Sequence, residues 1–127
     1  MKIIVGVIVL VLIIILSTFR LETKTLEQFY KGDLNDVTEI RILNGNSGYS
    51  KTVTDEKLVK AFLNKIKDIK FIPDENQEQR NGFNYAISLY VNDKATFSFS
   101  LGKVNENYYH TQPEILPIVD RFYYSLN

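Results

Sequence analysis

Cysteine and tryptophan are absent from this 127-residue chain, and it has a single histidine. The lack of cysteine excludes disulfides, thiolate metal sites, a thiol nucleophile and a lipid-bearing N-terminal cysteine. Charge of either sign is not in excess, because 15 basic residues face 15 acidic ones. A protein that binds nucleic acid needs a basic patch for the phosphates, so we expect no nucleic-acid partner.

Motifs that carry chemistry are also missing. His110 lies in no G-x-S-x-G or similar context. The acidic residues within 74–78 lack the ligand spacing of an EF-hand. Gly45 and Gly48 lie between two predicted strands and not before a helix, so they do not form a phosphate loop. We therefore predict a protein that is not an enzyme, with no catalytic residue, no metal site and no cofactor.

A long hydrophobic run is the strongest feature that the sequence has. Residues 3–16 carry no charge, and residues 17–19 extend the run to Arg20. A helix over the whole run would measure about 25 Å, at the short end for a bilayer core. The exit at 15–20 contains no alanine, whereas signal-peptide cleavage favours small residues, and a buried helix would have a polar face. An uncleaved signal anchor over 1–19 is thus favoured over a cleaved signal peptide or a buried segment.

The orientation of this anchor depends on weak signals. Lys2 precedes the run, whereas Arg20 and Lys24 follow it, so the positive-inside rule decides little. The short charged start and short hydrophobic stretch resemble an export signal. We therefore predict a single-pass protein of the cell membrane, attached through residues 3–19, with its domain on the extracytoplasmic side.

The remaining chain is long enough for one domain, since about a hundred residues can bury a core without disulfides. Residues 20–35 are predicted as a juxtamembrane stalk, and residues 36–127 as the extracytoplasmic domain. Alternation predicts strands over 37–43 and 49–53, joined by the turn 44–48.

An amphipathic helix is predicted over 54–68, with Thr54 as its N-cap. Its apolar residues recur at helical spacing: Leu58, Phe62, Ile66 and Ile69. A second helix is predicted from about Pro117 to the C-terminus, preceded by the capping-box spacing of 111–114.

Two further strands, 83–91 and 96–101, alternate strictly and predict a hairpin. A three-residue loop over 92–94 keeps one face of this hairpin apolar. The register then pairs Leu89 with Phe97 and Ile87 with Phe99. A short strand is also expected over 108–110.

These elements predict an α+β protein: an N-terminal transmembrane helix followed by a two-layer domain. The domain is expected to have an antiparallel sheet of about five strands, with one or two helices on one face. The other face is the candidate binding surface, because it has small polar side chains and one aromatic anchor. Its residues are Asn84, Ser88, Tyr90, Thr96, Ser98 and Ser100.

Four segments resemble small exported domains of Gram-positive, Bacillus-like bacteria: Asp36–Ile40, Asn44–Gly45, Thr54–Lys57 and Arg80–Tyr85. Those domains are held by a membrane helix or a lipid and are mostly uncharacterised, so the resemblance implies location more than activity. Anchoring by a lipid does not carry over, because the chain has no cysteine.

The function predicted from these features is a membrane-tethered, non-enzymatic extracytoplasmic binding or regulatory module that contacts a protein or peptide. Two alternatives stay open. The chain could be an accessory subunit of a membrane complex, or an enzyme whose site the sequence does not reveal.

Overall fold

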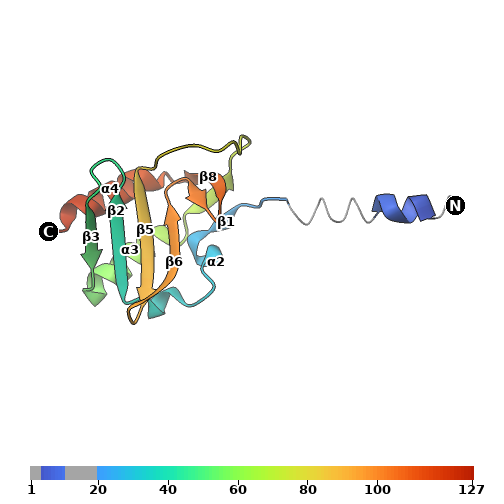
Figure 1. Cartoon of the computed structure of the whole chain (residues 1–127). Coiled ribbons are helices and arrows are strands. Elements are labelled where there is room, and N and C mark those ends of the chain that lie inside the picture. The colour runs from blue at the N-terminus through green and yellow to red at the C-terminus, as the bar shows by residue number, and fades with distance from the viewer. Residues whose placement is uncertain (1–3, 11–19) are drawn as a thin grey trace.

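One antiparallel sheet of eight strands organises the domain, in the order β1-β4-β8-β7-β6-β5-β2-β3. The computed structural model describes residues 4–10 and 20–127. Helices α3 and α4 cover one face of the sheet, and Figure 1 looks onto the other face. The strands are β1 (Lys24–Thr25), β2 (Glu39–Asn44), β3 (Ser50–Val53), β4 (Lys70–Pro73), β5 (Tyr85–Val91), β6 (Lys94–Ser100), β7 (Lys103–Val104) and β8 (Asn107–Gln112). The helices are α2 (Leu26–Phe29), the 3-10 helix η1 (Leu34–Asp36), α3 (Glu56–Ile66) and α4 (Ile115–Ser125).

The predicted number of about five strands is wrong, because β1, β4 and β7 were missed. β1 and β7 have two residues each, and β4 has four. Strands of two residues show no period of two in the sequence, and Pro73 at the end of β4 favours a loop there. Pairing with distant strands defines β1 and β4, because β1 pairs with β4, and β4 pairs with β8. β7 pairs with its chain neighbours β6 and β8.

The predicted transmembrane helix is also corrected. Within residues 4–10 and 20–127, no helix is both long and apolar enough to cross a membrane. The helical residues 4–10 would measure about 10 Å, against about 30 Å for a bilayer core. Residues 1–3 and 11–19, which the same prediction included, lie outside the described residues.

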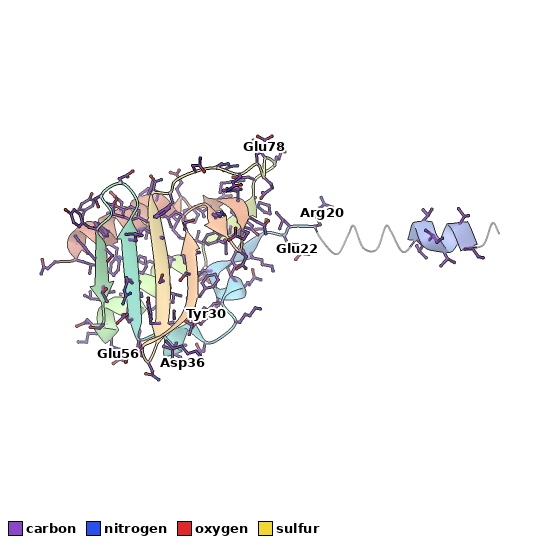
Figure 2. The ribbon with its side chains drawn as sticks, viewed as in Figure 1. Arg20, Glu22, Tyr30, Asp36, Glu56 and Glu78 are labelled. Carbon is purple, nitrogen blue, oxygen red and sulfur yellow. The ribbon has the colours of Figure 1, made fainter. Side chains whose placement is uncertain are left out.

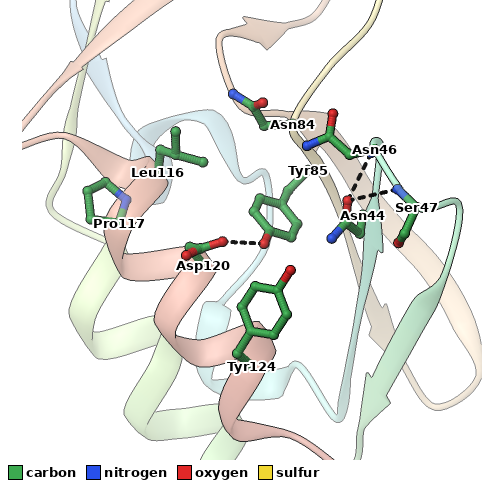
Figure 3. A pocket seen from close by; sticks show the side chains of 9 residues that line it. All are labelled: Asn44, Asn46, Ser47, Asn84, Tyr85, Leu116, Pro117, Asp120 and Tyr124. Atoms are coloured by element: carbon green, nitrogen blue, oxygen red, sulfur yellow. Dashed lines mark hydrogen bonds between the residues drawn. The ribbon is translucent and has the colours of Figure 1, made fainter.

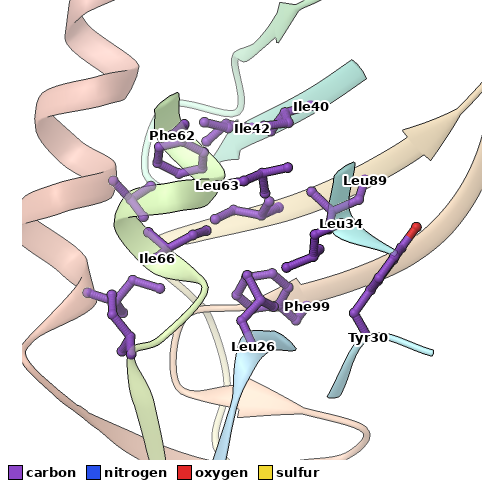
Figure 4. Packing of buried hydrophobic residues seen from close by; sticks show 14 of the residues in the cluster. Leu26, Tyr30, Leu34, Ile40, Ile42, Phe62, Leu63, Ile66, Leu89 and Phe99 are labelled. Carbon is purple, nitrogen blue, oxygen red and sulfur yellow. The ribbon is translucent and has the colours of Figure 1, made fainter. Parts of the chain in front are cut away.

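The segment 20–35 packs into the core where the sequence predicted a stalk. Thr25 begins α2 with a capping box, since its hydroxyl accepts from Gln28 N while Gln28 Oε1 accepts from Thr25 N. Buried side chains from this segment join the core around Phe62 and Phe99, as Figure 4 shows for Leu26, Tyr30 and Leu34. They are Leu26, Phe29, Tyr30 and Leu34. The packed part of the domain therefore extends upstream of residue 36.

The predicted register of the β5–β6 hairpin is confirmed, although the loop differs. Leu89 pairs with Phe97 and Ile87 with Phe99. The turn has two residues, Asn92 and Asp93, with φ of 49° and 68°, which suit a type I′ turn. A bulge between the Leu89–Phe97 and Tyr90–Ala95 pairs leaves Thr96 without a partner on β5. This extra residue restores the apolar face. The bulge, not a third loop residue, solves the register problem.

Helix α3 matches the predicted amphipathic helix except in its cap and one side chain. Asp55, and not Thr54, is the N-cap, with Oδ1 accepting from Leu58 N at 3.1 Å. Leu58 itself is 45% exposed. The buried face consists of Val59, Phe62, Leu63 and Ile66. The Phe62 and Phe122 rings stack with their centroids 4.1 Å apart, so this buried face of α3 also contacts α4.

Helix α4 begins at Ile115, slightly before the predicted start. Pro117 lies in its first turn, where the missing N–H has no intrahelical partner to lose. The predicted capping box does not form, because Thr111 remains in β8 and Glu114 makes no side-chain cap bond. The Thr111 hydroxyl nevertheless accepts from Ile115 N at 2.9 Å.

The hairpin register predicts very different costs for two adjacent substitutions. Phe99→Ala should lower the free energy of unfolding by about 3–5 kcal/mol, because it empties a buried aromatic site. Ser98→Ala should stay within about 0.5 kcal/mol, because Ser98 is exposed. Urea unfolding of both variants measures the difference, and equal costs would contradict the register.

The packing of α2 predicts that the domain needs the segment before residue 36. Leu26→Ala should cost about 2–5 kcal/mol, since Leu26 is 1% exposed. Lys31→Ala, on the exposed surface of the same segment, is the matched control and should change stability by less than about 0.5 kcal/mol. A detached stalk would instead leave the unfolding midpoint of Leu26→Ala unchanged.

Candidate functional site

The uncovered sheet face brings together most of the candidate binding residues. Ser88 and Ser98 pair across β5 and β6, and their hydroxyls lie 2.9 Å apart. Ser100 pairs with Ala86 in the neighbouring row. Small side chains therefore line the middle of this face, which makes it flat and rich in hydroxyl groups.

Tyr90 lies at one end of this face beside two charged residues of β2. The Arg41 guanidinium lies over the Tyr90 ring, 4.8 Å from its centroid. Arg41 Nη2 also donates to Glu39 Oε2 at 3.4 Å, and the Arg41 side chain remains 48% exposed. Alternation along β2 puts both charged residues on the polar face, but only the pairing of β2 with β5 shows that they neighbour Tyr90.

Thr96 is already committed to internal hydrogen bonds. Its hydroxyl donates to Leu89 O at 3.1 Å and lies 2.8 Å from the Tyr30 hydroxyl. Because the threonine has one hydroxyl proton, Tyr30 donates in the second bond. The bulge at Thr96 thus joins β6 to the segment that follows α2.

Asn84 lies away from this face, at a pocket of about 600 Å³. The pocket opens between the β2–β3 turn, the start of β5 and one side of α4 (Figure 3). It combines amide, hydroxyl, carboxylate, aromatic and aliphatic groups. The lining residues are Asn44, Asn46, Ser47, Asn84, Tyr85, Leu116, Pro117, Asp120 and Tyr124.

Asn44 and Gly45 shape one wall of the pocket. Asn44 Oδ1 accepts from Asn46 N at 2.9 Å and from Ser47 N at 3.2 Å, which fixes the turn. Gly45 N donates to Asn84 O at 2.7 Å. A Cβ at Gly45 would lie 2.0 Å from the Phe83 carbonyl oxygen, so this close approach requires glycine.

Tyr85 and Asp120 connect the sheet to α4 at the base of the pocket. The buried Tyr85 hydroxyl donates to Asp120 Oδ1 at 2.5 Å. Burial raises the pKa of Tyr85 well above its ordinary value, and the bond to the Asp120 carboxylate adds to the shift. Tyr85 therefore stays a hydrogen-bond donor at neutral pH.

His110 has an acidic partner that the sequence did not reveal. His110 Nδ1 lies 2.7 Å from Asp74 Oδ1, and Arg80 Nη1 donates to Asp74 Oδ2 at 3.0 Å. Burial alone would raise the pKa of Asp74, but the bonds from His110 and Arg80 outweigh it and lower that pKa. The Arg80 guanidinium also lies over the Tyr108 ring, 4.5 Å from its centroid. These contacts fasten the loop after β4 onto β8.

Tyrosines near the C-terminus divide between the core and the surface. Tyr108, Tyr109 and Tyr123 are buried, whereas Tyr124 is 66% exposed and lines the pocket. Within the described part of the chain, no group of three or more His, Asp or Glu side chains could hold a metal ion.

Comparison with known proteins does not add a relative. No family model matches the chain. No curated protein and no solved structure matches it either. The class of the protein is described by its own fold, an antiparallel sheet with helices on one face and the other face uncovered.

The Asp74 cluster predicts a pH-dependent contribution to stability. Asp74→Asn should be less stable than the wild type at neutral pH by up to about 1 kcal/mol. The pKa of Asp74 is lower in the folded than in the unfolded state, where it is about 3.9. Its contribution is therefore present above the unfolded value and lost as pH falls through the folded value.

Urea unfolding of wild type and Asp74→Asn between neutral and acidic pH measures this contribution. Glu78→Gln is the control, because Glu78 is exposed on the same loop and forms none of the ion pairs among the described residues. It should match the wild type at neutral pH. A stability gap for Asp74→Asn that stays constant down to strongly acidic pH would contradict the role of the carboxylate.

Proposed function

We propose that this chain is a membrane-attached, non-enzymatic binding module that contacts a protein or peptide through its uncovered sheet face. The observation that carries this proposal is the stack of Arg41 on Tyr90 at the end of a flat, hydroxyl-lined surface. Tyrosine and arginine are enriched among the residues that dominate binding energy at interfaces.

The layered architecture supports the choice of this face. α3 and α4 pack on the opposite side of the sheet and bury the apolar side chains there. Ser88, Ser98 and Ser100 on β5 and β6 have small side chains, which lose little conformational entropy when a partner covers them. Next to these serines, Tyr90 and Arg41 supply a large contact area, and their stacking holds the two side chains in place.

The chain between the hydrophobic run and the sheet is short. Residues 20–23 separate the end of that run from β1, which starts at Lys24. Figure 2 shows Arg20 and Glu22 on this extended connection. Four extended residues reach about 13 Å, so attachment through residues 3–19 would hold the domain close to the membrane. The partner is accordingly proposed to be a membrane protein or a segment near the surface, on the extracytoplasmic side.

An enzymatic function has one observation in its favour, the His110–Asp74 contact. Such a pair can orient an imidazole as a general base. Here the other Asp74 oxygen binds Arg80, and the His110 side chain is 61% exposed. The hydrogen bonds of the described residues give His110 no hydroxyl partner. The contact therefore supports fastening of the loop better than catalysis.

The open face predicts which charges would abolish partner binding. Tyr90→Lys combined with Ser98→Lys should reduce recovery of the partner from membranes at least about tenfold, because two charges would be buried without partners. Ala61→Lys with Asn64→Lys is the matched control, since both residues are exposed on α3. It should recover the partner as the wild type does.

Crosslinking in membranes followed by quantitative mass spectrometry measures recovery, and thermal melting checks the fold of each variant. Equal recovery by the double variant and the wild type, with equal melting, would remove this face from consideration. Loss of a hydrolytic activity in His110→Ala would overturn the non-enzymatic proposal.

A further inference from the structure

Asn44 carries a side-chain hydrogen-bond donor, Nδ2, that has no acceptor among the described residues. The residue is 6% exposed, and its Oδ1 is occupied by the N–H groups of Asn46 and Ser47. Its Nδ2 donates to no acceptor among the described residues, yet no buried side-chain nitrogen or oxygen of the described residues is left without a partner. Nδ2 must therefore reach the open space of the pocket, and Figure 3 shows it turned to the side where the Tyr124 hydroxyl points.

Asp120 offers a complementary acceptor across the same pocket. Its Oδ1 accepts from Tyr85, while its Oδ2 takes part in no hydrogen bond or ion pair of the described residues. A ligand that reaches both walls thus meets an amide donor on one side and a carboxylate acceptor on the other. A hydroxyl group can satisfy either, because it both donates and accepts.

The remaining walls suit a ligand with an apolar face. Tyr124 is 66% exposed and presents its ring at the rim, while Leu116 and Pro117 line the opposite side on α4. Asn46 and Asn84 add further amide groups around the opening. The pocket therefore combines several polar groups with a smaller set of apolar and aromatic walls.

The charges around the pocket favour a neutral ligand. The Asp120 carboxylate would repel an anion. The cation position on the nearby tyrosines is already filled, because Lys51 Nζ lies 4.3 Å from the Tyr123 ring centroid and 5.5 Å from that of Tyr124. Lys51 is held there by the carbonyl oxygens of Tyr123 and Leu126, each at 3.0 Å. A second cation would meet that ammonium group.

We propose that this pocket binds a sugar residue of a neutral saccharide. Hydroxyl groups of the sugar would accept from Asn44 Nδ2 and donate to Asp120 Oδ2, and its C–H face would pack on the Tyr124 ring. The pocket is separate from the sheet face around Tyr90, so this inference goes beyond the proposed protein or peptide contact.

The test uses the full chain in a zwitterionic detergent without sugar headgroups. The probes are the neutral disaccharides maltose, lactose and diacetylchitobiose, with tetramethylammonium and acetate as charged alternatives. Saturation-transfer NMR should detect at least one disaccharide at concentrations up to about 10 mM, the range of weak binding. Tetramethylammonium and acetate should not bind.

Three variants test the assigned contacts. Asn44→Asp keeps the acceptor that fixes the turn but removes the donor, and Asp120→Asn keeps a partner for Tyr85 but removes the charged acceptor. Tyr124→Ala removes the ring wall. Each should weaken saccharide binding at least tenfold, or about 1.4 kcal/mol. Tyr49→Ala is the control, because Tyr49 is 74% exposed and does not line the pocket.

Thermal melting checks whether each variant is folded. If Asn44→Asp does not fold, Tyr124→Ala still tests the proposal. The absence of any saccharide signal, or equal binding by Tyr124→Ala and the wild type, would overturn the proposal. If tetramethylammonium binds and Asp120→Asn abolishes that binding, the assignment of a neutral ligand would be overturned. The Tyr90→Lys, Ser98→Lys variant should keep saccharide binding, so failure of one proposal is distinguishable from failure of the other.

Discussion

The packing around Phe71 is the contact on which the rest of the domain depends. Phe71 is fully buried on β4 and meets Phe29, Phe99 and Tyr109 in edge-to-face contacts with centroids 5.7, 6.0 and 6.4 Å apart. Those rings come from α2, β6 and β8. One side chain therefore joins the N-terminal segment, the short strands and the long hairpin, and edge-to-face geometry adds to the area that each ring buries.

This arrangement explains why the two sides of the sheet differ. The apolar side chains of β2, β5 and β6 turn toward α3 and α4, so their alternating partners form the polar face. α4 is in turn held against β3 by Lys51, whose ammonium binds carbonyl oxygens at the helix C-terminus and complements its dipole. The same docking of α4 brings Asp120 to Tyr85 and so creates the pocket.

The pocket and the N-terminal connection lie at different parts of the sheet. β1 and β3 are the two edge strands, and residues 20–23 lead directly into β1. The pocket uses the turn between β2 and β3, next to the other edge. A ligand in the pocket would thus lie away from the edge strand β1, while the polar sheet face extends between them.

Features that depend on neighbouring residues could be predicted from the sequence. The alternation of β5 and β6 specified which residues face inward, and that pattern was enough to pair Leu89 with Phe97. The spacing of Phe62 and Ile66 likewise specified the buried side of α3. Both signals are local, because each side chain direction follows from the period of its own element.

Features that depend on distant residues could not be predicted from the sequence and arise from the packing of the whole domain. β1 is too short to show a period and exists through its pairing with β4. Leu26 is buried because the sheet provides a surface for α2. His110 contacts Asp74 because β8 pairs with β4, which lies much earlier in the sequence. Asn44 and Asp120 likewise line one pocket because α4 packs against the far earlier strand β2 and its turn. Such contacts need the whole strand order, which the packing of all the elements selects together and no local pattern encodes.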